Sequence, residues 1–339
     1  MQLIVERNTD PCHNLAQEEA LLNGVKEEII YLWRNRPSVI VGRHQNTLAE
    51  IDEKAVEKHG VNVVRRLTGG GAVFHDLGNV NFSFLFAGED FDKEAAKGCL
   101  LLLDFLTSLG VDPQLTGRND ICIKMTDGTL AKIAGTAMTE RDGRGIFHGC
   151  VLFDCDLHVM GEVLTPPAAK LAAKGTASVR SRVVNLKTLT PYLQQLSRDA
   201  FFEIWAAYMS ERCTCFHEVT EEEKELTEKL MEERYRSWHW NYGRNPSGTL
   251  VNSYRFPIGT VSLTLELSKG RIANCSFSGD YINRFDLDEL TTRLTDIPFD
   301  RKSLTAALET IDLHKYFGID DRALILDYMT GRYIEHEKD

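Results

Sequence analysis

The sequence predicts an α+β fold in which mixed, largely antiparallel sheets pack with helices, followed by a small α+β C-terminal domain. Short runs of β-branched and aromatic residues lie on both sides of a glycine loop. The stretch 117–156 has a strand–turn–strand–turn–strand pattern with Asp-Gly at both turns. The segment Asn241 to Gly248 then breaks the pattern with turn residues, and about ninety residues follow with strands and helices of their own. We therefore expect domains at 1–244 and 250–339.

The first elements expected are a helix and four strands. Asn14-Leu15-Ala16-Gln17 resembles a capping box, which predicts a helix that begins there and ends at Gly24. β-Branched and aromatic residues predict the strands, at 29–33, 39–41, 61–64 and 80–86. The glycine loop lies between the last two, where rigid strands can hold a site.

Later elements follow from periodicity and capping. A helix is expected over 93–109, with an apolar stripe formed by Ala96, Cys99, Leu100, Leu103, Leu106 and Leu109. Thr220-Glu221-Glu222-Glu223 resembles a capping box for a charged helix that reaches about Trp238. In the C-terminal domain we expect strands at 254–256, 260–267 and 271–277, and helices around 287–294 and 303–308.

Composition excludes several classes of function. The formal net charge of −11 argues against nucleic acid as a partner, and the aliphatic run 100–103 is too short to span a membrane. The N-terminal residues lack the pattern of a signal peptide, and eight irregularly spaced cysteines suit reduced thiols. The group Cys213, Cys215 and His217 has no second pair at zinc-site spacing, so it does not favour a metal site. We expect a cytoplasmic protein, and a monomer because no coiled-coil heptad or long apolar patch is apparent.

The run 65–79, Arg-Arg-Leu-Thr-Gly-Gly-Gly-Ala-Val-Phe-His-Asp-Leu-Gly-Asn, is the most informative part of the chain. Glycine lets the backbone approach a ligand closely, and bare amides in such a turn form an anion site. Arginine adds a planar fork of donors for phosphate or carboxylate. The segment predicts an anion cradle, although its spacing is neither a Walker A loop nor a dinucleotide fingerprint.

Three further segments could carry chemistry. Lys132, between an apolar strand and a Gly135-Thr136-Ala137 turn, could neutralise charge when a carboxylate attacks a phosphate. Asp120 is either a Mg²⁺ ligand or a turn or cap residue. His148, before Gly149, could line the site or be a structural histidine, and the same two readings apply to His75. The basic run from Lys170 to Arg182, which includes Lys174, is either a solvated loop or a phosphate-clamping flap that attracts an acidic partner.

In order and spacing, these four segments resemble the bacterial lipoate–protein ligase A family. Trp33-Arg34-Asn35, the run 41–46 and the neighbourhood of Trp238 to Pro246 are similar to further motifs of that family. The likeness covers nearly the whole chain and is strongest over 30–186. It implies a biotin/lipoate ligase-like catalytic domain with a C-terminal accessory domain, and one polypeptide that performs both steps of the reaction.

The resemblance implies that ATP and lipoate form lipoyl-adenylate, and that the lipoyl group then passes to a lysine of a lipoyl domain. Acceptors would be 2-oxoacid dehydrogenase acyltransferase subunits and the glycine-cleavage H protein. Lys132 would be the catalytic contact to carboxylate and α-phosphate, Trp33 would lie near the lipoyl tail, and Asp120 would hold Mg²⁺. The expected ATP- and lipoyl-AMP-binding set is Arg66, Gly69, Gly70, Gly71, Ala72, Val73, Phe74, His75, Asp120, Lys132, Gly135, Ala137, His148, Gly149, Lys174 and Arg182.

Other readings remain open. An octanoyl or lipoyl amidotransferase of the same fold takes its acyl group from a protein, in some relatives through a cysteine just before the position of Asp120. The segment 111–119 contains no cysteine, and Cys122 and Cys150 lie within expected strands. A biotin ligase would carry a glycine–arginine loop that is missing here. A non-enzymatic lipoate-binding protein need not retain Lys132 and Arg66. The preference between lipoate and octanoate is left open.

Overall fold

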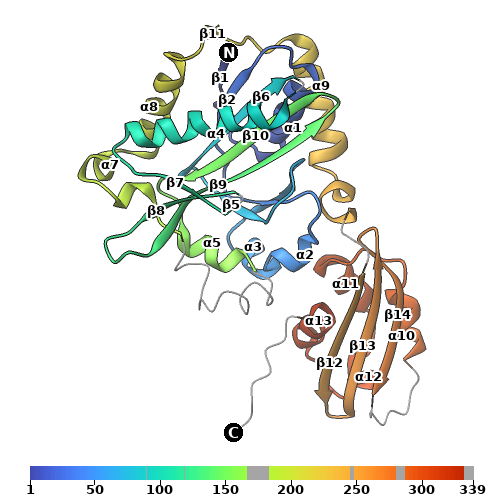
Figure 1. Cartoon of the computed structure of the whole chain (residues 1–339). Coiled ribbons are helices and arrows are strands. Elements are labelled where there is room, and N and C mark those ends of the chain that lie inside the picture. The colour runs from blue at the N-terminus through green and yellow to red at the C-terminus, as the bar shows by residue number, and fades with distance from the viewer. Residues whose placement is uncertain (89, 118, 166–182, 245–247, 280–286, 332–339) are drawn as a thin grey trace. The chain divides into compact units, whose positions relative to one another are not determined.

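The computed structural model describes residues 1–88, 90–117, 119–165, 183–244, 248–279 and 287–331. The chain divides into two compact units, Met1–Asn241 and Tyr242–Asp339 (Figure 1). Both units combine helices with β-sheet, which confirms the predicted α+β class.

An eight-stranded sheet forms the centre of the first unit, in the order β11-β1-β2-β6-β10-β9-β8-β7. β1 pairs in parallel with β2 and β11, and all other neighbours are antiparallel. The strands are β1 Gln2–Val5, β2 Ile29–Trp33, β6 Asn79–Ala87, β7 Gln114–Thr116, β8 Asp120–Lys124, β9 Leu130–Arg141, β10 Arg144–Leu152 and β11 Cys215–Phe216.

A second, three-stranded sheet has the order β4-β3-β5. Its strands are β3 Ser38–Val41, β4 Asn62–Arg65 and β5 Val73–His75. β5 was missed in the sequence, because the expected loop between 64 and 80 contains three residues that pair antiparallel with β3. The glycine loop is therefore shorter than expected and is held by strands of one small sheet on both sides.

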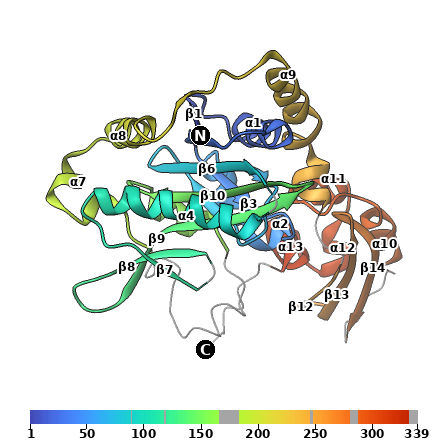
Figure 2. The same ribbon diagram turned by 45° about the horizontal axis from the view of Figure 1, so that its top comes forward.

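Helices cover both faces of the large sheet. Figure 2 shows α4 lying across β10 and β6, which it contacts. On the other face α1 packs beside α9. The helical elements described up to Gly243 are α1 Pro11–Gly24, α2 Thr47–Glu50, α3 Glu53–Lys58, α4 Phe91–Ser108, α5 Leu157–Val163, η2 Leu186–Thr188, α7 Pro191–Gln195, α8 Arg198–Ser210, α9 Glu221–Leu230, η3 Met231–Tyr235 and η4 His239–Gly243, the last of which crosses the boundary between the units.

Two apolar clusters lie on the two faces of the large sheet. One cluster joins α4 and α8 to sheet residues such as Phe82, and Phe105 stacks on Trp205 with centroids 4.4 Å apart. The other joins α1 to the opposite face through residues such as Tyr31 and Ile146. Successive residues of a strand point to opposite faces, so each central strand contributes to both clusters.

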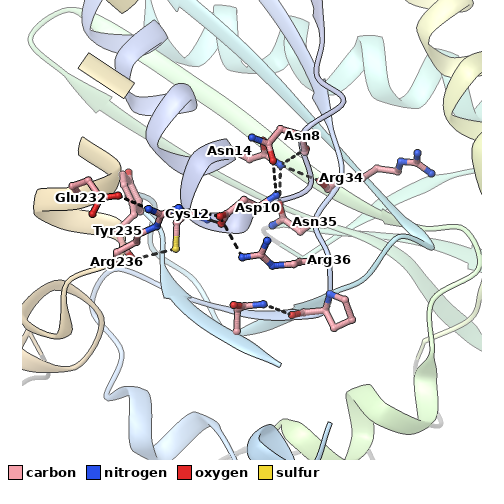
Figure 3. Close-up of polar contacts among 12 residues, drawn as sticks. Asn8, Asp10, Cys12, Asn14, Arg34, Asn35, Arg36, Glu232, Tyr235 and Arg236 are labelled. Atoms are coloured by element: carbon pink, nitrogen blue, oxygen red, sulfur yellow. Dashed lines mark hydrogen bonds and ion pairs between the residues drawn. The ribbon is translucent and has the colours of Figure 1, made fainter. Parts of the chain in front are cut away.

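The first helix begins earlier than predicted. Asp10 caps it by accepting a hydrogen bond from the Cys12 amide, and its carboxylate also pairs with Arg36 and Arg236 (Figure 3). Asn14, expected at the start, instead lies buried inside α1 and donates to the backbone of Asn8 and Arg34. The capping-box prediction was wrong here because this asparagine makes tertiary rather than local hydrogen bonds.

At the second expected capping box, Thr220 and Glu223 make both reciprocal hydrogen bonds, as predicted. α9 ends at Leu230, and the π-helical stretch η3 takes the place of the rest of the helix expected to about Trp238. A second π-helical stretch, η4, follows it. Both Asp-Gly turns are formed, with positive φ at Gly128, Asp142 and Gly143.

The second unit contains a three-stranded antiparallel sheet with four helices among its described residues. Phe256, Phe317 and Tyr328 form an aromatic cluster in its core. Its elements are β12 Gly248–Phe256, β13 Gly259–Ser268, β14 Arg271–Gly279, α10 Asp288–Leu294, α11 Arg301–Leu308, α12 Leu313–Phe317 and α13 Arg322–Thr330. Across the described parts of both units, each helix is too short or too polar to cross a membrane.

Candidate active site

A cavity of about 500 Å³ lies between the large sheet and the small β4-β3-β5 sheet of the first unit. Ile40 and Phe74 line it from the small sheet, and residues of β2, β6, β8, β9 and β10 line it from the large sheet. It contains most of the residues expected at the site: Trp33, Arg66, Gly70, Gly71, Ala72, Val73, Phe74, His75, Asp120, Lys132, Gly135, Ala137, His148 and Gly149.

One row of paired residues crosses five strands of the cavity wall. In register, Trp33 lies opposite Asn81, Asn81 opposite Cys150, Cys150 opposite Gly135, and Gly135 opposite Asp120. All five line the cavity. The row brings an indole at one end and a carboxylate at the other onto the same face, although the two residues are 87 positions apart in the sequence.

The glycine loop closes one side of this cavity. Gly70 has a φ of 93°, which favours glycine, and no described residue accepts a hydrogen bond from the amides of Gly70, Gly71 or Ala72. The loop packs tightly on the segment after β3, because a Cβ at Gly42 would lie 2.1 Å from the Gly70 carbonyl oxygen. These three amides are therefore available to a ligand in the cavity.

Arg66 braces that loop from inside. Its guanidinium donates to Thr68 Oγ1 and to the carbonyl oxygens of Ile40, Gly69 and Gly71, at 2.6 to 3.0 Å. Gly69 itself does not line the cavity and takes part through this carbonyl. Burial lowers the pKa of Arg66 to about 10, so the side chain stays cationic at neutral pH. Three of these hydrogen bonds thus hold the loop shape, and the fourth ties the guanidinium to β3.

Arg65, which precedes it, is fully buried and does not line the cavity. It donates to the carbonyl oxygens of Gly42, Arg43, Gln45, Trp240 and Asn241. It joins the loop after β3 to the end of the first unit.

A buried polar chain leads from this loop to Trp33. Thr68 Oγ1 lies 2.8 Å from His148 Nε2, and His148 Nδ1 lies 2.9 Å from the Glu18 carboxylate. Glu18 also accepts from Ser83, which in turn accepts from the Trp33 indole N–H. His148 therefore lines the cavity and is also held by contacts to Thr68 and Glu18.

Lys132 and Asp120 lie together at the opposite end of the row. The Lys132 ammonium is 2.6 Å from Asp120 Oδ1, and about 70% of each side chain is buried, since 29% and 28% remain exposed. The lysine side chain folds over Gly135, where a Cβ would lie 2.9 Å from Nζ. Asp120 is thus a partner of the lysine rather than a turn or cap residue.

His75 lies at the Trp33 end. Its ring packs edge-on against the indole with centroids 6.0 Å apart, and its Nδ1 lies 3.2 Å from the Asn35 amide nitrogen. Burial, with the nearby charge of Arg66, lowers the pKa of His75 to about 3, so the ring is neutral at neutral pH. His75 is a neutral hydrogen-bonding residue of the cavity wall.

Two family models and several known proteins match this chain over most of its length. Residues 10–210 match the model of the lipoyl protein ligase A/B catalytic domain, and residues 245–329 match the bacterial lipoate protein ligase C-terminus. Lipoate-protein ligase LplJ of Bacillus subtilis is 37% identical over 319 residues, which cover 91% of this chain and 93% of that protein.

The chain belongs to the lipoate–protein ligase family.

Solved structures of this lipoate–protein ligase family agree with the fold. A bipartite lipoate protein ligase from Thermoplasma acidophilum, described together with its E2 lipoyl domain, has a TM-score of 0.60 and 30% identity, covering 71% of this chain and 95% of that one. A lipoate-protein ligase A bound with ATP has a TM-score of 0.58 and 28% identity, covering 71% and 97%.

Two of the expected site residues lie outside the described part of the chain: Lys174 and Arg182. Three residues near the site were not expected from the sequence: Glu18, Asn81 and Thr136, of which the last two line the cavity. Helix and strand patterns gave no reason to single them out. Asn81 could have been found from its alternation with Ser83, since both are polar residues on one face of an otherwise apolar strand.

The remaining candidates have structural explanations. The His217 ring nitrogens contact Gln2 and Glu223, so this histidine joins β11 to neighbouring elements. Cys150 lines the cavity, but burial raises the pKa of its thiol to about 12, which makes it a poor nucleophile.

Proposed function

We propose that this protein is an ATP-dependent lipoate–protein ligase that forms lipoyl-adenylate and passes the lipoyl group to a lysine of a lipoyl domain. One observation carries the proposal: a single cavity has the Lys132 ammonium at one end, the flat apolar face of Trp33 at the other, and free amides of the glycine loop along its wall. That arrangement suits a substrate with an anionic head and an apolar tail.

In the first step the lipoate carboxylate attacks the α-phosphorus of ATP and pyrophosphate leaves. Two anions must approach each other, so fixed positive charge and amide dipoles lower the barrier. Lys132 and the amides of Gly70, Gly71 and Ala72 are the groups we assign to this role. Arg66 supports them by holding the loop and by its charge, and no protein nucleophile is needed.

The proposal also assigns separate roles to the two domains. We assign catalysis to 1–244 and an accessory role to 250–339, supported by the compact units and by the two matched family models. His75, Val73 and Phe74 would wall the acyl and adenylate site, with Gly135, Ala137, His148 and Gly149 opposite. Lys174 and Arg182 would complete it from a basic loop.

Mg²⁺ is part of the proposal on chemical grounds. Magnesium ions in such sites use one or two carboxylates together with substrate phosphates, and Asp120 supplies one carboxylate in the cavity. The described residues offer no cluster of three or more metal-ligating side chains. Asp120 would hold the ion together with the ATP phosphates, where the ion would neutralise phosphate charge.

In the second step an acceptor lysine attacks the adenylate carbonyl and AMP leaves. A lipoate ligase similar to this chain has been described with an E2 lipoyl domain, which supports lipoyl domains as acceptors. Acyltransferase subunits of 2-oxoacid dehydrogenases and the glycine-cleavage H protein are the acceptors we propose. We further propose a monomer acting in the cytoplasm, where eight free cysteines are compatible with reducing conditions.

The competing amidotransferase would need an acyl-carrying nucleophile. Cys150 is a cysteine of the cavity wall, and its buried thiol with a raised pKa does not favour that role. A non-enzymatic lipoate-binding protein would bind lipoate without releasing pyrophosphate from ATP, so one assay separates it from the ligase.

The test is lipoate-dependent release of pyrophosphate from ATP in the absence of an acceptor protein. Lys132→Ala should lower this rate by about a hundredfold or more, because a charge-stabilising contact is lost. Lys124→Ala is the matched control: this lysine is exposed on the same hairpin and does not line the cavity, so its rate should match the wild type. Equal rates for the two variants, or no lipoate dependence in the wild type, would refute the assignment.

A further inference from the structure

Two side chains of the cavity wall present buried polar atoms without a partner among the described residues. They are Asn81, through both atoms of its amide, and His75, through Nε2. The two residues are 2% and 4% exposed, and both line the cavity. Buried polar groups in folded proteins are normally hydrogen-bonded, so these atoms point to something that binds in the cavity.

Hydrogen-bond directions identify what His75 offers. Asn14 donates its amide N–H to the Asn35 side-chain oxygen (Figure 3), which leaves the Asn35 amide nitrogen as the donor to His75 Nδ1. Because Nδ1 accepts, the proton of the neutral ring lies on Nε2. The unpartnered Nε2 is therefore an N–H donor, like the Asn81 amide nitrogen.

These groups lie at the end of the cavity away from Lys132. Asn81 is opposite Trp33 in register and two strands from Gly135, over which Lys132 folds. Neighbouring strands are about 4.8 Å apart, so Asn81 lies roughly 10 Å from the anionic end. That separation matches an extended medium-chain acyl group whose carboxylate is held near Lys132.

A plain alkyl tail would cover these donors without satisfying them, which has a free-energy cost. Divalent sulfur is a weak hydrogen-bond acceptor and is polarizable, so it lowers that cost. The same wall already contains such a contact, because the Asn79 amide nitrogen lies 3.2 Å from Cys150 Sγ.

We propose that Asn81, with His75, forms a polar subsite that receives the ring sulfurs of lipoate and selects this acid over a plain fatty acid such as octanoate. The inference rests on the proposed function, since it assigns the acyl preference of the same site. Asn81 acts in this scheme as a specificity-determining residue and takes no part in the chemical step.

The experiment compares kcat/KM for pyrophosphate release with lipoate and with octanoate, in the full-length wild type and in Asn81→Leu. Leucine keeps the branched outline of asparagine and removes both polar atoms. The wild type should prefer lipoate, and Asn81→Leu should lower the lipoate-to-octanoate ratio roughly tenfold, because octanoate no longer covers an unmatched amide. Asn81→Ser, which keeps a polar group, should retain a lipoate preference.

Controls separate selectivity from general damage. Leu152→Met exchanges one apolar side chain of the same wall for another of similar volume, so it should change both acids alike. Thermal unfolding checks each variant, and Asn81→Val is the second apolar substitution if leucine prevents folding. A wild type without lipoate preference, or a ratio unchanged in the apolar variant, would overturn the proposal.

Failure of the proposed function gives a different result. If neither acid causes pyrophosphate release with the folded wild type, the ligase assignment fails, and calorimetric affinities for the two acids then decide the subsite. Tighter binding of lipoate that is lost in Asn81→Leu supports the subsite, whereas equal affinities in both proteins reject it.

Discussion

Lys132 and Gly135 lie three residues apart on β9, and the glycine determines where the lysine ammonium can lie. A Cβ at Gly135 would be 2.9 Å from Nζ and 3.1 Å from Cε of the lysine. The Asp120 carboxylate holds the ammonium from the other side at 2.6 Å. The position of this charge therefore depends on a missing side chain as much as on its ion-pair partner.

Gly135→Ala should thus slow lipoate-dependent pyrophosphate release by between roughly ten- and a hundredfold, because a small misplacement of a catalytic group is costly. The fold should survive, since the clash involves the far end of a flexible side chain. Stopped-time pyrophosphate assays and thermal unfolding measure the two effects.

Gly88→Ala is the matched control for that change. A Cβ at Gly88 would only reach the Glu94 side chain at 3.8 Å, which is an ordinary contact. This variant should keep wild-type activity. A Gly135→Ala protein that was as active as this control would show that the ammonium position is not set by the glycine.

Arg66 illustrates what a motif reveals at the residue scale. The sequence singled out the arginine beside three glycines, and in the structure the arginine and two of the glycines, Gly70 and Gly71, line one cavity. Its hydrogen bonds to three carbonyl oxygens could not be foreseen, because they depend on the path of the loop around the guanidinium. Glu18 was missed for a similar reason: its link to His148 joins residues 130 positions apart.

At the scale of elements, α4 was predicted to within a few residues, and Leu106 and Leu109 of the expected apolar stripe are buried, but another part of the stripe is exposed. Leu100, expected in the apolar stripe, is 58% exposed. The face that packs on the sheet contains Gly98 instead, where a Cβ would lie 2.8 Å from Phe84 and 3.0 Å from Phe147. A pattern of apolar side chains cannot reveal that Gly98 faces the sheet, because the rings of Phe84 and Phe147 fill the space above this glycine.

Two substitutions on α4 test this packing. Gly98→Ala should lower the free energy of unfolding by about 1–2 kcal/mol, because overpacking outweighs the better helix propensity of alanine. Leu100→Ala should change it by less than about 0.5 kcal/mol, as for other surface positions. Urea unfolding measures both, and the opposite order of the two losses would mean that the helix face with Leu100, and not the face with Gly98, packs on the sheet.

Strand prediction fared better where local signals were complete. The Asp-Gly turns fixed the β8–β9–β10 hairpins, and so the strands that hold Asp120, Lys132 and His148. β5 was missed because three residues between a glycine loop and a turn give too short a pattern.

At the scale of the whole molecule, the site arises from strand order that no local signal specifies. β2 and β6 are neighbours in the sheet although the small β4-β3-β5 sheet is built from the chain between them. That topology places Trp33 in one row with Asp120 and lets the glycine loop cover the row. From the sequence, only the resemblance to a family could anticipate this assembly.

The measurement that tests the central claim most directly is mass spectrometry of the full-length protein after incubation with lipoate and ATP, before and after adding an unmodified lipoyl domain. Our account predicts bound lipoyl-AMP before the addition, and afterwards its loss with one lipoyl group on a single acceptor lysine. A folded protein that forms no adenylate, or an acceptor that becomes modified only from a protein-bound acyl donor without ATP, would contradict the account.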